Sequence, residues 1–299
     1  MVPPGIEPGT HGFSVRCSTN WAKVPRQSGC KYIVYFIIPQ NKRYKKWFCK
    51  FTPFILQMNL IVDVGNTNVK LAVFQDGAMV NKEIIDINEI EVKIQELIKK
   101  QPLLSKAIMS SVGNISQKQL TYITKHLETI VLSSHTKIPF KNKYKTPNTL
   151  GVDRIALVSA SVLKYPQKNV LIIDAGTCIT YDFINAKNEY LGGAISPGIS
   201  MRYNSLNNLT VNLPLLKRKA PKKLIGNSSK ESIHSGVING ILMEIDGIVE
   251  KYHKKYKDLT VILTGGDADF LSKQLKSSIF ANSIFLLEGL NYILEFNTN

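Results

Sequence analysis

The stretch Leu60-Ile61-Val62-Asp63-Val64-Gly65-Asn66-Thr67 decides the fold, because an apolar run carries one aspartate into a glycine turn. The same pattern returns 111 residues later, in Leu171-Ile172-Ile173-Asp174-Ala175-Gly176-Thr177. In each case a second apolar stretch follows the turn, at residues 69–74 and 179–184. A repeated supersecondary unit indicates a repeated architecture, so the sequence predicts two related α/β domains of roughly 110–130 residues that face each other.

The segments around these units predict further elements. Apolar residues at helical spacing indicate helices over residues 88–100, 116–127, 153–163, 229–256 (one or two helices) and 286–296. Short apolar runs predict strands at 107–112 and 260–263. Ser229 is the expected cap of the helical region that begins there.

The first 57 residues differ from the rest of the chain. They hold nine Lys and Arg residues against the single acid Glu7, and therefore +8 of the net charge of +16. Six of the 13 prolines interrupt this stretch, and no helical or strand period is sustained in it. Its segment from Gly5 to Ala22 resembles the peptides that result when upstream non-coding sequence is translated by mistake. We therefore expect 1–57 to be a non-native or disordered leader, and the functional protein to start at Met58.

Composition excludes several classes of protein. No apolar run approaches the ~18 residues of a membrane helix, and the four cysteines are too few for a disulfide scaffold. From Met58 onward only Cys178 remains, which suits a reducing cytoplasm. Half of the positive charge lies in the leader, and the remainder shows no nucleic-acid-binding motif. We expect a cytoplasmic protein that binds neither nucleic acid nor membrane.

The segment DVGNTNVK, residues 63–70, has the residue types that a nucleoside triphosphate requires. A buried strand tolerates an aspartate poorly unless the carboxylate is paired or holds a metal, and Asp63 at a strand end could hold a hydrated Mg²⁺. Gly65 lets the backbone approach a ligand closely, and Lys70 adds a positive charge. Taken alone, the segment is also compatible with a simple hairpin that has a polar turn.

Three further segments extend this site. DAGT at 174–177 repeats the aspartate and the glycine turn, so two carboxylates are expected to line one cleft. TGG at 264–266 ends a strand with paired glycines, which can lie flat against a nucleotide. GVDR at 151–154 starts a helix, and its Asp153 and Arg154 could act as a base and as an anion-binding group. The alternative for GVDR is a helix cap beside a surface arginine.

In this order the motifs resemble those of the type III pantothenate kinases, members of the actin-like ATPase and sugar-kinase superfamily. The resemblance runs from Met58 to Phe296 and includes GGAISPG at 192–198 and IGNSSKESIHSG at 225–236. It implies an α/β fold of two duplicated ribonuclease-H-like (actin-like) domains, with the active site in the cleft between them. The expected domains are residues 58–167 and 168–299.

The resemblance also implies an activity: transfer of the ATP γ-phosphoryl group to pantothenate, the first step of coenzyme A biosynthesis, by a cytoplasmic homodimer. Asp153 is then the general base, and Asp174 holds a monovalent cation, K⁺ or NH₄⁺. Asp63 binds Mg²⁺ through water. The ATP-binding residues implied are Asp63, Val64, Gly65, Asn66, Thr67, Asn68, Val69, Lys70 and Thr177. The pantothenate-binding residues implied are Tyr144, Gly151, Val152, Asp153, Arg154 and Ser229.

One position departs from the family pattern, because Ser229 stands where a threonine is common, and Ser228 is an alternative match. A serine keeps the hydroxyl group, so we expect weaker binding and not loss of function. Two other functions stay open from the sequence: a non-catalytic regulator on the same fold, and a kinase of the same superfamily with another small-molecule acceptor. The presence of Asp63, Asp153 and Asp174 argues against the regulator.

Overall fold

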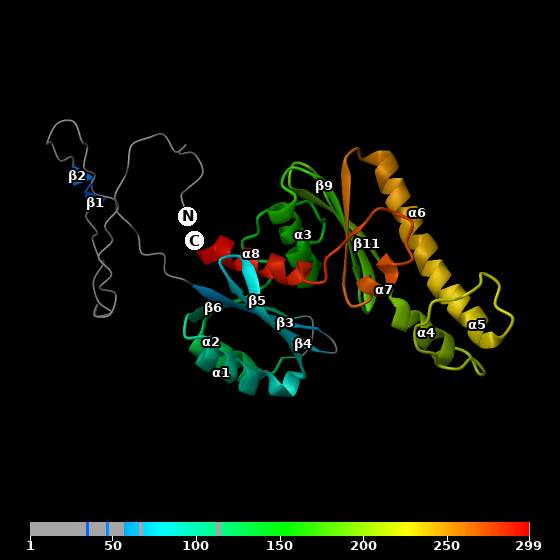
Figure 1. Cartoon of the computed structure of the whole chain (residues 1–299), viewed down its shortest axis with the longest axis horizontal. Coiled ribbons are helices and arrows are strands. Elements are labelled where there is room, and N and C mark those ends of the chain that lie inside the picture. The colour runs from blue at the N-terminus through cyan, green and yellow to red at the C-terminus, as the bar shows by residue number, and fades with distance from the viewer. Residues whose placement is uncertain (1–33, 36–45, 48–56, 66–67, 112–114, 299) are drawn as a thin grey trace, which may run out of the picture. The chain divides into compact units, whose positions relative to one another are not determined.

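The computed structural model describes residues 34–35, 46–47, 57–65, 68–111 and 115–298. The chain divides into two compact units, Met1–Ile55 and Leu56–Asn299. In the first unit, strand β1 (Val34–Tyr35) pairs antiparallel with β2 (Lys46–Trp47). Most of the expected leader therefore lies outside the described residues. All further elements belong to the second unit (Figure 1).

The first large sheet of this unit has the strand order β5-β4-β3-β6-β7. Its strands are β3 (Met58–Val64), β4 (Val69–Gln75), β5 (Ala78–Ile85), β6 (Leu104–Ser111) and β7 (Glu128–Val131). Strand β3 lies at the centre, antiparallel to β4 and parallel to β6. All of its residues are buried, as expected for a central strand that is covered on both faces.

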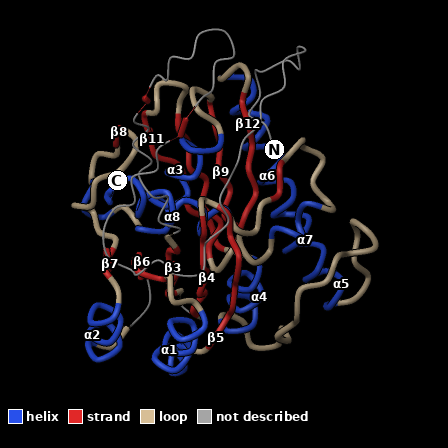
Figure 2. Tube along the Cα trace, turned by 60° about the vertical axis from the view of Figure 1, so that its left-hand side comes forward, coloured by secondary structure: helices blue, strands red, loops and turns tan. Residues whose placement is uncertain are grey.

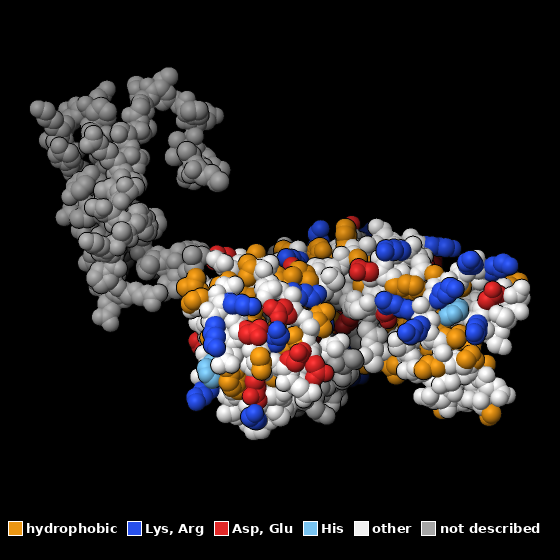
Figure 3. Space-filling model, turned by 60° about the horizontal axis from the view of Figure 1, so that its bottom comes forward, with side chains coloured by type: hydrophobic (Ala, Val, Ile, Leu, Met, Phe, Trp, Pro, Cys, Tyr) orange, Lys and Arg blue, Asp and Glu red, His pale blue; other side chains and the backbone are white. Residues whose placement is uncertain are grey.

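Helices α1 (Ile90–Lys100) and α2 (Gln117–His126) cover one face of this sheet, and Figure 2 shows them side by side. Ile90, Ile94 and Leu97 form the buried stripe of α1, and α1 follows a short 3₁₀ turn, Ile87–Glu89. Ser116 caps α2 in a capping box with Gln119. Figure 3 shows acidic and basic side chains interspersed over this lobe, whereas Lys and Arg predominate on the other lobe in that view.

The second large sheet has the order β13-β12-β9-β10-β11-β8. Its strands are β9 (Asn169–Ala175), β10 (Cys178–Ile184), β11 (Glu189–Pro197), β12 (Leu259–Thr264), β13 (Phe280–Ala281) and β8 (Lys141–Asn142). Strand β9 pairs antiparallel with β10 and parallel with β12, as β3 does with β4 and β6. Apart from β8, the two sheets therefore share their strand order and directions.

Helix α3 (Val152–Lys164), which follows a 3₁₀ turn at Pro147–Thr149, packs against α8 (Phe285–Thr298). Helix α3 contacts β6 of the first sheet and β9 and β10 of the second, and α8 contacts β3 and β6. One core cluster includes Ile61 and Ile108 of the first sheet, Ile172 of the second, and apolar residues of both helices. A side chain at Gly289 of α8 would overlap the carbonyl of Ala156 in α3, so glycine allows the helices to approach closely. The start of α3 is thereby held between the two sheets.

The other face of the second sheet carries the remaining helices: α4 (Ile199–Asn208), α5 (Ser229–His234), α6 (Gly240–Lys255) and α7 (Ala268–Ser272). A π-helical turn at Ser235–Asn239 joins α5 to α6. No helix within the described part of the chain is long and apolar enough to cross a membrane.

Most expected helices and strands are present, but the residue that caps α5 differs from the expected one. Ser228, and not Ser229, caps α5, because its side chain accepts a hydrogen bond from the amide of Glu231. The boundary expected between residues 167 and 168 stays a prediction. Two elements lie on the opposite side of this boundary from the sheet that they contact. Strand β8 precedes the boundary but joins the second sheet, and α8 follows it but packs on β3 and β6 of the first sheet.

Candidate active site

The turn between β3 and β4 places Asp63 one residue before the end of the central strand. Its carboxylate is 5% exposed, and Lys70, its cross-strand neighbour on β4, donates to Oδ2 at 3.0 Å. The amide of Gly65 donates to the carbonyl of Asn68 and closes the turn. Val64 and Val69 are buried in the core, so only their backbone groups are available to a ligand. Asn66 and Thr67, two expected phosphate-binding residues, lie outside the described residues.

The turn between β9 and β10 repeats this arrangement around Asp174. The carboxylate of Asp174 is half-buried, and its cross-strand neighbours are Thr180 on β10 and Thr264 on β12. Thr177 is exposed at the tip, and its carbonyl accepts a hydrogen bond from the amide of Gly198. The glycine-rich segment 192–198, which forms much of β11, is thereby tied to this turn.

The glycines at the end of β12 lie directly against the second turn. Gly265 has a φ of 95°, and a side chain there would overlap both Asp174 Oδ1 and the carbonyl of Ala175. The amide of Asp267 also donates to the Ala175 carbonyl at 2.9 Å. Only glycine combines this backbone conformation with so close an approach, so TGG and DAGT form one structural unit.

Asp153 lies in the first turn of α3, where the helix dipole favours a carboxylate. Its Oδ1 accepts a hydrogen bond from the Arg154 amide at 2.8 Å. Burial, and then the negative charges of Asp182 and Asp63, raise the pKa of Asp153, although the Arg154 amide opposes this. Burial followed by the charge of Asp153 likewise raises the pKa of Asp174 to about 7. The structure therefore brings Asp63, Asp153 and Asp174 together.

Arg154 points from α3 toward β10, where it meets an aspartate that the motif analysis missed. Its side chain is buried, and Nε donates to Oδ1 of Asp182 at 2.8 Å. Asp182 lies within the apolar strand Cys178–Ile184 and belongs to no recognised motif. A buried aspartate in an otherwise apolar strand was the signal that identified Asp63, and the same reasoning applied to Asp182 would have found it.

Tyr144 joins this group of residues. Its ring stacks on Tyr190 at 6.0 Å, and the Arg154 guanidinium carbon lies 5.6 Å from its centroid. Gly192, with a φ of 101°, leaves room for the ring, because a side chain there would press against Tyr144. Tyr144, Gly151, Val152, Asp153 and Arg154, all expected to bind substrate, thus surround the start of α3.

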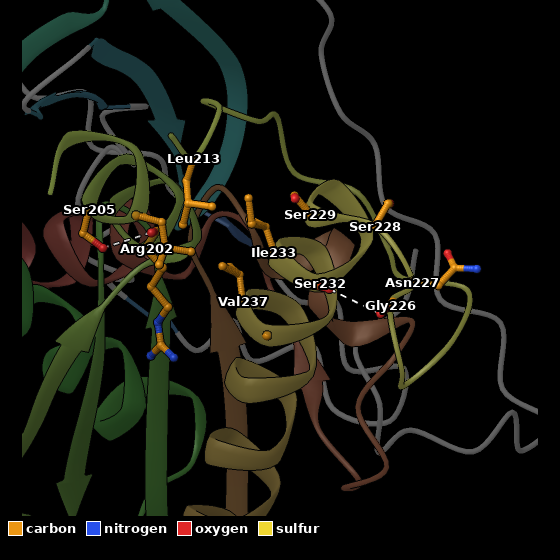
Figure 4. Close-up of a pocket in the computed structure, with 12 residues that line it drawn as sticks. Arg202, Ser205, Leu213, Gly226, Asn227, Ser228, Ser229, Ser232, Ile233 and Val237 are labelled. Atoms are coloured by element: carbon orange, nitrogen blue, oxygen red, sulfur yellow. Dashed lines mark hydrogen bonds between the residues drawn. The ribbon is translucent and has the colours of Figure 1, made fainter. Parts of the chain in front are cut away.

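Ser229 lies elsewhere. It lines a pocket of ≈ 980 Å³ between α4, the segment after it, and α5 (Figure 4). Figures 1 and 2 both show α5 at the far end of the second lobe from α3. The full lining is Arg202, Ser205, Leu206, Leu213, Gly226, Asn227, Ser228, Ser229, Ser232, Ile233, Gly236 and Val237. Within one chain, Ser229 is therefore not brought to Asp153.

The oxygen atoms near the carboxylates suit hard cations. Two buried hydroxyl groups, Ser110 beside Asp63 and Thr180 beside Asp174, make no hydrogen bond to the described residues. No group of three or more His, Cys, Asp or Glu side chains within the described part of the chain forms a ready metal cage. A cation here would be held by one or two carboxylates together with substrate oxygens and water, as Mg²⁺ usually is.

Comparison with known proteins identifies the family of this chain. The family model for type III pantothenate kinases matches residues 59–251. A type III pantothenate kinase from Christiangramia forsetii is 52% identical over 240 residues, which cover 80% of this chain and 99% of the relative. One from Flavobacterium johnsoniae is 46% identical over 239 residues, covering 80% and 98%. A solved Baf family protein from Campylobacter jejuni has a TM-score of 0.53 at 21% identity, covering 80% and 98%, and supports the fold alone.

Proposed function

Because the chain belongs to the type III pantothenate kinase family, and so phosphorylates pantothenate with ATP in coenzyme A biosynthesis, we propose that the reaction takes place where Asp153 faces the two aspartate turns. The observation that carries this proposal is the convergence of Asp63, Asp153 and Asp174, whose charges act on one another. The matching strand order of the two sheets supports a duplicated ribonuclease-H-like fold with this cleft between its halves.

Asp153 is the general base of the proposed reaction. One oxygen, Oδ1, is held by the Arg154 amide, which leaves Oδ2 for the proton of the pantothenate hydroxyl. The hydroxyl oxygen forms a bond to the γ-phosphorus while the bond to the β–γ bridging oxygen breaks, and ADP leaves. A pKa above the usual aspartate value makes the carboxylate a better proton acceptor, provided that it is ionised at the working pH.

ATP binds along the two turns. Residues 63–70 supply the Lys70 ammonium group, backbone amides and the polar side chains of the β3–β4 turn to the phosphates, and Thr177 supplies a contact from the β9–β10 turn. Lys70 is partly exposed although it is paired with Asp63, so its charge can reach an anion in the cleft. Backbone amides and a lysine are the groups that stabilise the charge of a transferring phosphoryl group.

Two cations complete the site. Asp63 holds Mg²⁺ through water, and Asp174 holds K⁺ or NH₄⁺. The raised pKa of Asp174 supports this role, because a buried carboxylate that lies close to other carboxylates is stabilised by a bound cation. When bound, the two cations offset the negative charge of the phosphates. Asp63 and Asp174 themselves fix the cations at the ends of β3 and β9.

Pantothenate binds against Tyr144 and Gly151–Arg154, and the cytoplasmic enzyme works as a homodimer. In this proposal Ser229 reaches a pantothenate molecule that is bound to the partner chain, since its own Asp153 lies elsewhere in the fold. Exposed apolar side chains near β11, α4 and α6 support such an interface: Ile195 is 63%, Met201 41% and Met243 64% exposed.

The test is an ATP-consumption assay with and without pantothenate, in potassium and in sodium buffer, combined with the mass of the protein in solution. ATP consumption that depends on pantothenate and rises with potassium is expected from a dimeric protein. Equal activity in sodium would remove the proposed role of Asp174, and an active monomer would remove the role of Ser229 across the interface.

A further inference from the structure

Asp182 stands out among the charged residues of the described chain, because its side chain is fully buried and its charge acts on both Asp153 and Asp174. It is 0% exposed, and on its face of the sheet the neighbouring position on β9 is the core residue Ile172. A carboxylate in such a place destabilises the fold unless it is paired and hydrogen-bonded. The protein therefore retains a buried carboxylate that must be paired, and the contacts of Asp182 indicate what role it has.

All the observed contacts of Asp182 converge on one oxygen atom. Oδ1 accepts hydrogen bonds from Arg154 Nε at 2.8 Å and from the Tyr190 hydroxyl at 2.7 Å, and Arg154 Nη2 lies 2.7 Å away. Burial alone would lower the pKa of Arg154, but the hydrogen bond and charge of Asp182 raise it above its ordinary value. The guanidinium group is thus fixed as a cation on the β10 side of α3.

Arg154 follows Asp153 directly in the sequence, so the position of its guanidinium group affects the Asp153 carboxylate, the proposed base. The positive charge of Arg154 already acts on Asp153, and Asp182 competes for it from β10. If the charge of Asp182 were removed, Asp153 would be the nearest carboxylate along the chain for the guanidinium group to pair with. A carboxylate that is engaged in such an ion pair is a weaker proton acceptor, because the positive charge favours its ionised form.

From this arrangement we infer that Asp182 is a positioning residue: it holds the Arg154 guanidinium away from Asp153 and so keeps the Asp153 carboxylate free for the acceptor hydroxyl. This inference rests on the proposed role of Asp153. It gives the buried Arg154–Asp182 ion pair a catalytic purpose beyond joining α3 to β10.

The first measurement is kcat for Asp182→Asn at saturating ATP and pantothenate. Asparagine keeps the shape of the side chain and removes its charge. We expect a decrease on the order of tenfold, smaller than the ~10²-fold expected for loss of the base itself. Unchanged kcat would overturn the inference.

The decisive measurement is the double variant Asp182→Asn with Arg154→Gln, which has neither charge. Because Arg154 is also a proposed pantothenate contact, kcat is measured at a pantothenate concentration that saturates this variant. Without a guanidinium group to engage Asp153, kcat should recover to at least about threefold above that of Asp182→Asn. A double variant no faster than Asp182→Asn would overturn the inference. Because no buried charge is left unpaired, this variant avoids the main cause of misfolding that Arg154→Gln alone would face.

Tyr190→Phe is the matched control. It removes one hydrogen bond to Oδ1 but leaves the ion pair with Arg154, so kcat should stay within about threefold of wild type. A loss equal to that of Asp182→Asn would mean that the hydrogen bond to Oδ1, and not the charge that holds Arg154, is responsible, and would overturn the inference.

Asp153→Asn separates this inference from the proposed function. If Asp153→Asn keeps its activity, the role of Asp153 as the base fails, whatever Asp182 does. If Asp153→Asn is inactive while Asp182→Asn is unaffected, only the inference about Asp182 fails.

Discussion

In the β3–β4 turn, the aspartate at the end of the central strand faces a lysine, whereas its counterpart in the β9–β10 turn faces a threonine. The two positions are equivalent, since each aspartate is the second-to-last residue of the central strand of its sheet. Lys70 lies 3.0 Å from Asp63, while the hydroxyl of Thr180 beside Asp174 has no hydrogen-bond partner among the described residues. The same backbone therefore provides two different electrostatic sites.

The difference shows how a repeated unit can be adapted for two tasks. Lys70 pairs with Asp63 and is still partly exposed, so in the proposed function it can also contact the ATP phosphates. Asp174 has no lysine opposite it on the neighbouring strand, and burial followed by the charge of Asp153 raises its pKa, so a bound cation would stabilise it. In the proposed function, this one cross-strand residue distinguishes the phosphate-binding turn from the cation-binding turn.

The largest effect is expected at Asp153, on which charges from the first turn and from the second sheet both act. Asp153→Asn removes the proton acceptor, so kcat at saturating substrates should fall by roughly 10²-fold or more with little change in ATP binding. Steady-state kinetics and an ATP-binding measurement check this. A kcat within threefold of wild type would mean that the base is another group, and that Asp153 is not the catalytic residue near the two turns.

The second prediction compares glycines at the two turns. Gly265→Ala should destabilise the fold by about 1–3 kcal/mol, because φ is positive there and a methyl group would overlap Asp174 and the Ala175 carbonyl. Gly65→Ala should cost less than about 1 kcal/mol, since its nearest contact, at 3.3 Å, is the carbonyl of Asn68. Denaturant unfolding of both variants measures the difference. Equal losses would contradict the special packing of TGG against the second turn.

The third prediction uses the raised pKa of Asp174. A folded pKa of about 7, above the unfolded value near 3.9, means that the folded state binds the extra proton between these pH values. Its contribution to stability is therefore present at low pH and is lost as the pH rises from about 4 to 7. In Asp174→Asn the melting temperature should fall less over this range than in wild type, when both are measured without potassium.

The same variant tests the proposed cation. Asp174→Asn should lower activity by roughly tenfold and lose most of its dependence on potassium, because the charge that holds the ion is gone. Titration of activity with potassium chloride at constant ionic strength measures this. Activation with the wild-type concentration dependence would assign the cation to other groups.

The smallest effect is expected from removal of residues 1–57, which lie outside both turns. A chain that starts at Met58 should match the full chain within about 1 kcal/mol in stability and show the same specific activity, because the turns, α3 and α8 all lie after that residue. Thermal unfolding and kinetics of the two chains provide the comparison. A greater loss of stability would show that the first 57 residues contribute to the fold.

Local patterns in the sequence were enough to place both turns and the start of α3. Strand, aspartate and glycine succeed one another within eight residues, and the apolar spacing in α1 repeats at the period of a helix, so these elements can be recognised from neighbours along the chain. Ser228 shows the limit of this reasoning. Adjacent serines are equally good caps, and the geometry of the preceding segment selects between them.

Contacts between distant residues were decided only by the tertiary structure. The pairing of Arg154 with Asp182, the packing of Gly265 on Asp174, and the separation of Ser229 from Asp153 all depend on which strands are neighbours and which face each helix covers. One sequence pattern is compatible with many such arrangements, because periodicity specifies a buried face but not the partner that buries it. The order of the strands and the packing of α3 between the sheets determine which residues become neighbours, and so bring the separate motifs together.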